Sequence, residues 1–96
     1  MDPDQENLIA RLRSGDKAAA VSLIEQMYQR IYCFLRRLTA HESDAADLTQ
    51  RTFGRVWQAL PTFAGKSSVA SWIHAIAYHV YVDWRRAGRR FESRTG

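Results

Sequence analysis

The residues that most often do chemistry are few in this chain, and their spacing does not form a catalytic or metal site. The histidines, His41, His74 and His79, do not share one helix face with acids at metal-ligand spacing, and no nucleophile–base motif is visible. Cys33 is the only cysteine, which excludes an internal disulfide and a paired-cysteine metal site. We therefore expect no enzymatic activity and no cofactor. Cys33 itself, between Tyr32 and Phe34, is expected to be a small buried hydrophobe.

The clearest chemical signal is a basic block near the end of the chain. Five arginines stand there against one acid, Glu92: they are Arg85, Arg86, Arg89, Arg90 and Arg94. The segment carries 5 − 1 = +4, which equals the formal net charge of +4 for the whole chain. Such a block attracts polyanions, either nucleic acid or an anionic membrane surface. The alternative is a solvated tail that only aids solubility.

The elements that position these residues are all predicted to be helices. Apolar residues recur at steps of three and four, which predicts helices over about 4–14, 17–40, 44–60 and 68–86. The breaks between these helices are marked by Gly15-Asp16, Ser43, Pro61 and Ser67-Ser68. Gly15 suits a left-handed helix end, and Asp16, Ser43 and Ser67 or Ser68 are natural N-caps. Phe53, Val56 and Trp57 fall on the expected apolar face of the third helix. With 46% apolar residues and no β pattern, the chain is expected to be an all-α, compact bundle of about four helices.

No targeting or membrane segment is evident. The acidic start, Met1 to Asp4, lacks the apolar stretch of a signal peptide, and no apolar run approaches the roughly 20 residues that a span requires. We expect a cytoplasmic bacterial protein without a membrane span.

The stretch from Asp44 to Arg90 carries four patterns in register. They are a D-L-x-Q-x-x-F-x-x-x-W helix over 47–57, an F-x-G-x-S loop over 63–67, a W-I-x-x-I-A segment over 72–77, and a D-x-x-R-R-like ending from Asp83. Together they resemble region 2 of sigma factors of the extracytoplasmic-function type, within the sigma-70 family. The resemblance extends over nearly the whole chain, including the Gly15-Asp16 turn. It implies a transcription initiation factor that binds RNA polymerase core and melts the −10 promoter element.

The resemblance implies that the polar face of the third helix docks on the clamp helices of the largest polymerase subunit. On this chain that face is Asp47, Gln50, Arg51, Gly54 and Arg55. The alternative is a solvated face with an Asp47–Arg51 pair. Arg51 stands where the family commonly has an acid, so we expect a compensating change on the polymerase or a contact shifted toward Asp47 and Gln50.

The resemblance further implies that the loop and the exposed side of the fourth helix capture the single non-template strand of promoter DNA. The loop over 63–71 would receive a flipped base, using small donors and one cation with Phe63 or Trp72 as a wall; its members are Phe63, Gly65, Lys66, Ser67, Ser68 and Ser71. Tyr78 and His79, the latter where the family commonly has Asn, would stack on bases. Arg85, Arg86, Arg89 and Arg90 would hold phosphates. The alternatives are a capped turn whose two aromatics lie in the core, and a His79 without a role.

Residues 1–90 are thus expected to form sigma region 2, with 91–96 starting a linker to a second, helix-turn-helix domain that this chain lacks. An anti-sigma protein that covers the clamp-docking face is a further expected partner. Two other functions remain open. One is a helix-turn-helix regulator that reads duplex DNA, and the other is a sigma-like interaction module that no longer melts DNA.

Overall fold

The computed structural model describes the backbone of residues 3–95 and the side chains of residues 6–88. Four helices follow one another: α1 over Pro3–Arg13, α2 over Lys17–Thr39, α3 over Glu42–Ala59 and α4 over Val69–Thr95. A single 3-10 turn, η1 over Leu60–Thr62, follows α3. Every element in the described range is helical, so the predicted all-α class is confirmed.

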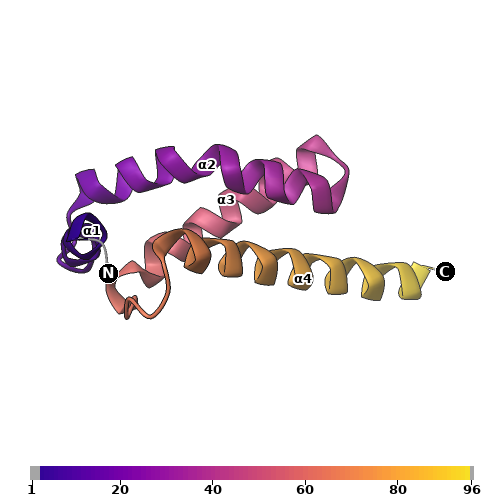
Figure 1. Ribbon diagram of the computed structural model, residues 1–96. Helices are drawn as coiled ribbons and strands as arrows, with labels where there is room; N and C mark the ends of the chain where they lie inside the picture. Colours follow the sequence, from indigo (N-terminus) through magenta and orange to yellow (C-terminus); the bar gives the residue numbers. More distant parts are fainter. Residues whose placement is uncertain (1–2, 96) are drawn as a thin grey trace.

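The helix α3 lies at the centre of the bundle and packs against both α2 and α4 (Figure 1). α1 crosses one end of the bundle, where it contacts α2 and η1. The last turns of α4 project past the turn that joins α2 to α3 (Figure 1), so the molecule is elongated, 53 × 22 × 22 Å.

The core forms where the apolar stripes of the three long helices meet. Side chains with no exposed surface come from each of them: Ile31 and Leu35 from α2, Leu48 and Val56 from α3, and Ile73 and Ala77 from α4. Full burial of an Ile, Leu or Val side chain among these is worth about 1.5–3 kcal/mol. Thr49 and Thr52 are also fully buried, and each hydroxyl donates to the carbonyl four residues earlier at 2.7 Å. Their hydroxyls therefore carry no unpaired desolvation cost.

Two predicted caps are confirmed. Gly15 adopts φ 84°, and the Asp16 carboxylate accepts a hydrogen bond from the Ala19 amide at 3.1 Å. The Ser68 hydroxyl accepts from the Ser71 amide at 3.1 Å at the start of α4. The predicted cap at Ser43 is wrong. Ala40 turns left-handed with φ 63°, so the α2–α3 turn is two residues long and α3 begins at Glu42, with Ser43 already inside it.

Several expected positions differ from the structure. α3 ends at Ala59 rather than Leu60, because Pro61 has no N–H to continue the helical hydrogen bonds, and the chain passes into η1. α4 continues to Thr95 instead of ending near Arg86, since no proline interrupts the sequence there. Cys33 is exposed, not buried, because it lies on the side of α2 away from Ile31 and Leu35, where its Sγ accepts from the Gln29 side chain at 3.7 Å.

The Asp16 cap generates a pH-dependent prediction. The hydrogen bond from the Ala19 amide, and next the Arg11 side chain at 2.9 Å, hold the pKa of Asp16 below its ordinary value of 3.8. A folded-state pKa below the unfolded one contributes stability above the unfolded pKa, and this stability is lost as pH falls through the folded pKa. We expect Asp16→Ala to lower Tm by about 4–8 °C at pH 7, and the difference from the parent chain to shrink as pH falls below 3.8. Thermal melts at several pH values check this. Glu25→Ala, on the exposed side of α2, is the control, and an Asp16 effect that did not vary with pH would contradict it.

Candidate functional site

The polar face of α3 is open to solvent along its whole length. Asp47, Gln50, Arg51, Gly54 and Arg55 are all exposed. The Arg51 guanidinium lies 2.8 Å from the Asp47 carboxylate, so the expected pair forms one turn apart. A Cβ at Gly54 would have open space around it, so no side chain projects from the middle of this face.

Trp57 belongs to this face and not to the core, which corrects the expected position of this side chain. Its side chain is 45% exposed. It lies one turn beyond Gly54 and two turns beyond Gln50, a spacing of three and four that could have revealed it in the sequence. Beside it an apolar groove of about 220 Å³ runs between α1, α2 and η1, lined by Leu12, Ala20, Leu60 and Pro61 among others. The α3 face thus combines a mixed-charge stripe with one large aromatic.

The loop between η1 and α4 is held in place by aromatic packing. Phe63 is buried and stacks at a tilt on the half-buried Trp72, with ring centroids 4.6 Å apart. Gly65 has φ 73°, a conformation that side chains rarely adopt, and its position faces the Ile9 side chain of α1. Next to these aromatics lies a cavity of about 300 Å³, lined by Thr62, Phe63, Lys66, Ser67 and Trp72 among others. The two aromatics therefore form the inner wall of a small hollow.

The serines of this segment are not equivalent. Ser68 is used as the cap of α4, and its hydroxyl also donates to Ser71 Oγ at 2.9 Å. Ser67 is exposed and bonds only to a neighbouring carbonyl, at 3.2 Å. The groups that remain available at the cavity mouth are Lys66 and Ser67, whereas Ser68 and Ser71 shape the helix start.

The exposed side of α4 carries Tyr78, which is 51% exposed, and the exposed His79. His79 Nδ1 lies 2.8 Å from the Ala75 carbonyl, and in a hydrogen bond there the ring N–H is the donor. His74 differs, because its ring is half-buried and packs edge-on against Phe34 with centroids 5.4 Å apart. Of the two α4 histidines, His79 is therefore the one whose ring is exposed to a ligand.

The arginines at the end of α4 begin where this aromatic side ends. The Arg85 guanidinium donates to the Tyr81 hydroxyl at 3.3 Å, and Arg86 is exposed. Tyr81, which the sequence pattern did not place in the core, is buried. Arg89 and Arg90 belong to the helical backbone of α4, but their side chains lie outside the described residues.

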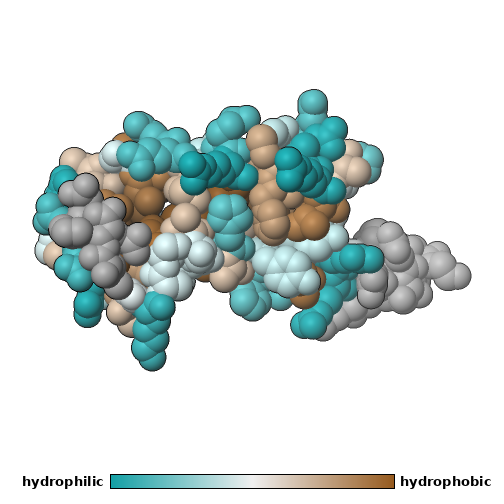
Figure 2. Space-filling model, viewed as in Figure 1, coloured by the Kyte–Doolittle hydropathy of each residue, from teal (hydrophilic) through white to brown (hydrophobic). Residues whose placement is uncertain are grey.

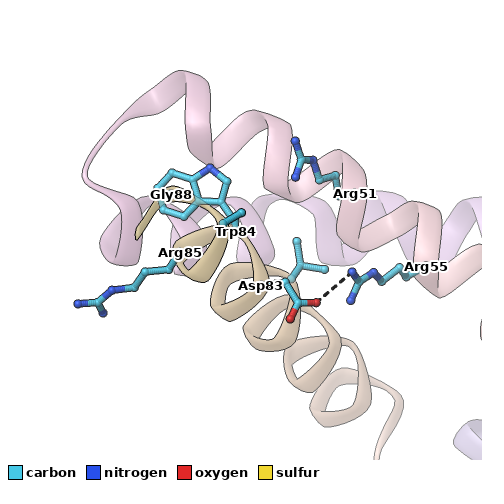
Figure 3. A pocket seen from close by; sticks show the side chains of 8 residues that line it. Arg51, Arg55, Asp83, Trp84, Arg85 and Gly88 are labelled. Atoms are coloured by element: carbon cyan, nitrogen blue, oxygen red, sulfur yellow. Dashed lines mark hydrogen bonds and ion pairs between the residues drawn. The ribbon is translucent and has the colours of Figure 1, made fainter. Parts of the chain in front are cut away.

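The two predicted faces meet in a groove between α3 and α4 (Figure 3). The groove measures about 670 Å³ and is lined by Arg51, Arg55, Val80, Asp83, Trp84, Arg85, Ala87 and Gly88. Arg55 of α3 reaches across it to Asp83 of α4, with 3.3 Å between guanidinium and carboxylate. From the sequence we expected two separate faces, whereas in the structure this ion pair connects them.

Polar and apolar side chains gather over different parts of the molecule when it is seen from the side drawn in Figure 1. Figure 2 shows hydrophilic side chains over α2, with hydrophobic ones visible between α2 and the elements below it. Among the described residues, no three His, Cys, Asp or Glu side chains are grouped closely enough to hold a metal ion. No described helix is both long and apolar enough to cross a membrane.

Comparison with known proteins assigns this arrangement to a family. The model of Sigma-70 region 2 matches residues 23–91. The chain belongs to the sigma-70 region 2 family. Its relatives include the RNA polymerase sigma factor YlaC of Bacillus subtilis, 37% identical over 73% of this chain, and the ECF RNA polymerase sigma factor SigG of Mycobacterium tuberculosis, 40% identical over 88% of it. An engineered region 2 of sigmaE, solved by NMR in complex with GTAAAA, has the same fold, with a TM-score of 0.80, 24% identity, and coverage of 96% of this chain and 99% of that one.

The region 2 chain is short beside its sigma-factor relatives. It spans 40% of the length of YlaC and 22% of the length of SigG. The match therefore assigns family and fold to this segment, as the four sequence patterns predicted.

The contact between α3 and α4 across the groove generates a prediction about stability. The side chains of Arg55 and Asp83 are 51% and 59% exposed, and exposed ion pairs contribute little because water screens them. We expect a double-mutant cycle of Arg55→Ala and Asp83→Ala in urea unfolding to give a coupling of about 0.2–1 kcal/mol. The Asp47–Arg51 pair within α3 serves as the reference cycle. A coupling well above the upper value would mean that this pair holds the two helices together.

Proposed function

We propose that this chain is the part of a transcription initiation factor that binds RNA polymerase core and captures the non-template strand of the −10 promoter element. The observation that carries the proposal is that one region 2 fold presents two different surfaces. One is the mixed-charge α3 face with Trp57, and the other is the loop cavity followed by the exposed rings and arginines of α4.

The α3 face is suited to a protein partner. A protein interface is stabilised mainly by a few desolvated aromatic or arginine anchors surrounded by polar contacts. Trp57 supplies such an anchor beside an apolar groove, and Gln50 with Asp47 supplies polar groups on the flat stretch around Gly54. The clamp helices of the largest polymerase subunit are the proposed partner. An anti-sigma protein would inhibit by covering the same face.

The loop and α4 are suited to unpaired bases. The cavity beside Phe63 and Trp72 is floored by aromatics and edged by Lys66 and Ser67, which suits one flipped base with its phosphate outside. Tyr78 and His79 then offer ring faces to the neighbouring bases, and Arg85 and Arg86 offer charge to the backbone. That the solved region 2 with the same fold was captured with GTAAAA supports an oligonucleotide on this fold.

Melting then needs no chemical fuel. Unstacking a base step costs a few kcal/mol, and each base stacked on an aromatic side chain returns about 1–3 kcal/mol. A surface that binds the separated strand better than the duplex shifts the closed-to-open equilibrium by that difference in affinity. The proposed role is therefore equilibrium capture of the open state.

Docking is tested on the α3 face. Asp47→Ala with Gln50→Ala, and separately Trp57→Ala, should each weaken association with core polymerase by about fivefold or more, because truncation of an important interface side chain costs about 1 kcal/mol or above. Binding of an isolated single strand should not change. Pull-down with core polymerase measures the first quantity and fluorescence titration the second. Gln29→Ala, exposed on α2, is the control. A loss of strand binding in the α3 variants would mean that the two faces are assigned the wrong way round.

Strand capture is tested by separating stacking from charge. Tyr78→Ala should lower the affinity for a single-stranded oligonucleotide by about 5- to 150-fold, because a stacked base is lost, with little change in salt dependence. Arg85→Gln with Arg86→Gln should instead reduce the slope of log affinity against log salt by about 1.4, since two phosphate contacts are removed. Titrations at several salt concentrations in the presence of polymerase check both.

Transcription from a pre-melted template completes that test. Restored activity of the Tyr78→Ala protein on such a template supports a role in strand separation. Equal affinity of the parent chain for duplex and single strand, with polymerase present, would overturn the proposal.

A further inference from the structure

The groove between α3 and α4 brings arginines of both proposed surfaces together with side chains that neither surface uses, Trp84 among them. Its volume of about 670 Å³ falls within the 300–1,000 Å³ of small-molecule sites. Three arginines and one acid line it, Arg51, Arg55 and Arg85 against Asp83. With Asp47, which pairs with Arg51 at 2.8 Å, these charged side chains carry 3 − 2 = +1. An anion entering the groove therefore meets a favourable field.

The two arginines of α3 keep donors available despite their ion pairs. A guanidinium has five N–H donors in a planar fork. The contact of Arg55 with Asp83 at 3.3 Å and that of Arg51 with Asp47 at 2.8 Å are both exposed, with side chains 50–59% exposed. Such pairs are weak and exchange readily. Arg51 and Arg55 are one helical turn apart, so their forks can contact one phosphate group or two adjacent ones.

Opposite these arginines, α4 supplies an aromatic ring and open space. Trp84 is half-buried, and its indole lies on the α4 side of the groove across from Arg51 (Figure 3). Gly88 is one turn further on, and a Cβ there would meet nothing within 4 Å, so the wall beside the indole is open. Arg85 lies at the rim with its guanidinium turned away from α3 (Figure 3). A planar ring and a phosphate would therefore be received at different walls.

From this arrangement we propose that the groove binds a nucleotide, with its phosphates on Arg51 and Arg55 and its base against the Trp84 indole. A base stacked on an aromatic side chain and a phosphate on arginine forks are each well-established contacts. An acidic peptide would satisfy the arginines but would leave the indole without a planar partner. The nucleotide is either free in solution or one unit of a nucleic-acid strand.

The proposal goes beyond the proposed function, because it requires neither polymerase nor promoter. It also implies regulation. Arg51 and Arg55 belong to the α3 face, so a nucleotide in the groove occupies cations of the proposed docking surface. Bound nucleotide and docked polymerase are then competitors for the same side chains.

The decisive test uses two substitutions with opposite effects. The probes are a nucleoside triphosphate, inorganic pyrophosphate and a short single-stranded oligonucleotide, titrated calorimetrically into the full chain without polymerase. Arg55→Gln should weaken triphosphate binding by about tenfold, through loss of a charged donor. Asp83→Asn should tighten it by about threefold, because the competing carboxylate is neutralised. Arg13→Gln in α1, at the other end of the bundle, is the charge-matched control, and circular dichroism checks the fold of every variant.

The aromatic wall is tested separately. Trp84→Ala should lower the affinity for the triphosphate by about fivefold or more and leave the affinity for pyrophosphate unchanged. Trp84→Phe should restore most of the lost affinity. Pyrophosphate binding as tight as triphosphate binding in the parent chain would overturn the assignment of a base to Trp84. Tighter binding of an acidic peptide than of any nucleotide, or an unchanged affinity in Asp83→Asn, would overturn the nucleotide site.

The remaining arms identify the source of the nucleotide. If Arg55→Gln and Trp84→Ala lower the affinity for the oligonucleotide by the same factor as the affinity for the triphosphate, the groove binds one unit of a strand. If only the triphosphate responds, the ligand is a free nucleotide. Tyr78→Ala distinguishes the groove from the strand-capture surface, because it should lower the affinity for the oligonucleotide and leave the affinity for the triphosphate unchanged.

Discussion

The arrangement of the whole molecule depends on the burial of one side of α3 between α2 and α4. Leu48, Thr49, Thr52 and Val56 have no exposed surface, so this side of the helix is fully enclosed. The buried threonines permit close packing because each hydroxyl is satisfied by its own helix at 2.7 Å. Enclosure of one side fixes the rotation of α3, and this rotation decides which residues remain for a partner. The stripe from Asp47 to Trp57 is exposed because the bundle packs against the other side of α3, and α4 reaches the edge of this stripe through the Arg55–Asp83 pair.

The same packing decides how the loop and α4 are presented. Phe63 and Trp72 lock the loop to the start of α4, while Ile73 and Ala77 fix the rotation of α4 against α2 and α3. Tyr78 and His79 are therefore turned outward by the burial of their neighbours. On the proposed function, polymerase and strand are then held at a fixed relative orientation by one rigid core. The Arg55–Asp83 pair lies at the surface of that core and adds little to its rigidity.

The sequence was most informative where a local interaction determines the outcome. Asp16 and Ser68 cap their helices as predicted, because the bonded groups lie within three residues. Gly15 also takes the left-handed conformation that the sequence predicted at the end of α1. The four sequence patterns likewise predicted the family and the fold. Local reasoning was wrong at Ser43 only because the left-handed Ala40 moves the helix start forward, and nothing about alanine signals that conformation.

Residues at the edge of an apolar stripe were not predictable in this way. Trp57 and Tyr81 are both bulky aromatics on a helical stripe, yet Trp57 is 45% exposed and Tyr81 is 9% exposed. Periodicity gives the centre of a stripe, but the neighbouring helix decides how far burial extends to each side. Cys33 was misjudged for a related reason, because its apolar neighbours suggested a core that lies on the other side of α2. The roles of the candidate site residues depend on partners and strands, and a single chain's pattern does not contain them.

The α3–α4 groove exists because α4 is longer than the part of it that α3 covers. α4 continues past the point where α3 can cover it, so near Trp84 and Gly88 the two helices share a hollow in place of a packed seam. Charged side chains collect there because they can reach water, and Arg51 and Arg55 face the α4 wall from α3. A hollow of this kind contributes nothing to the core. Val80 and Trp84 of its lining pack in or against the core, but its exposed charged residues can change without loss of the fold. This freedom makes the junction of the two faces a natural place for a ligand to act on both.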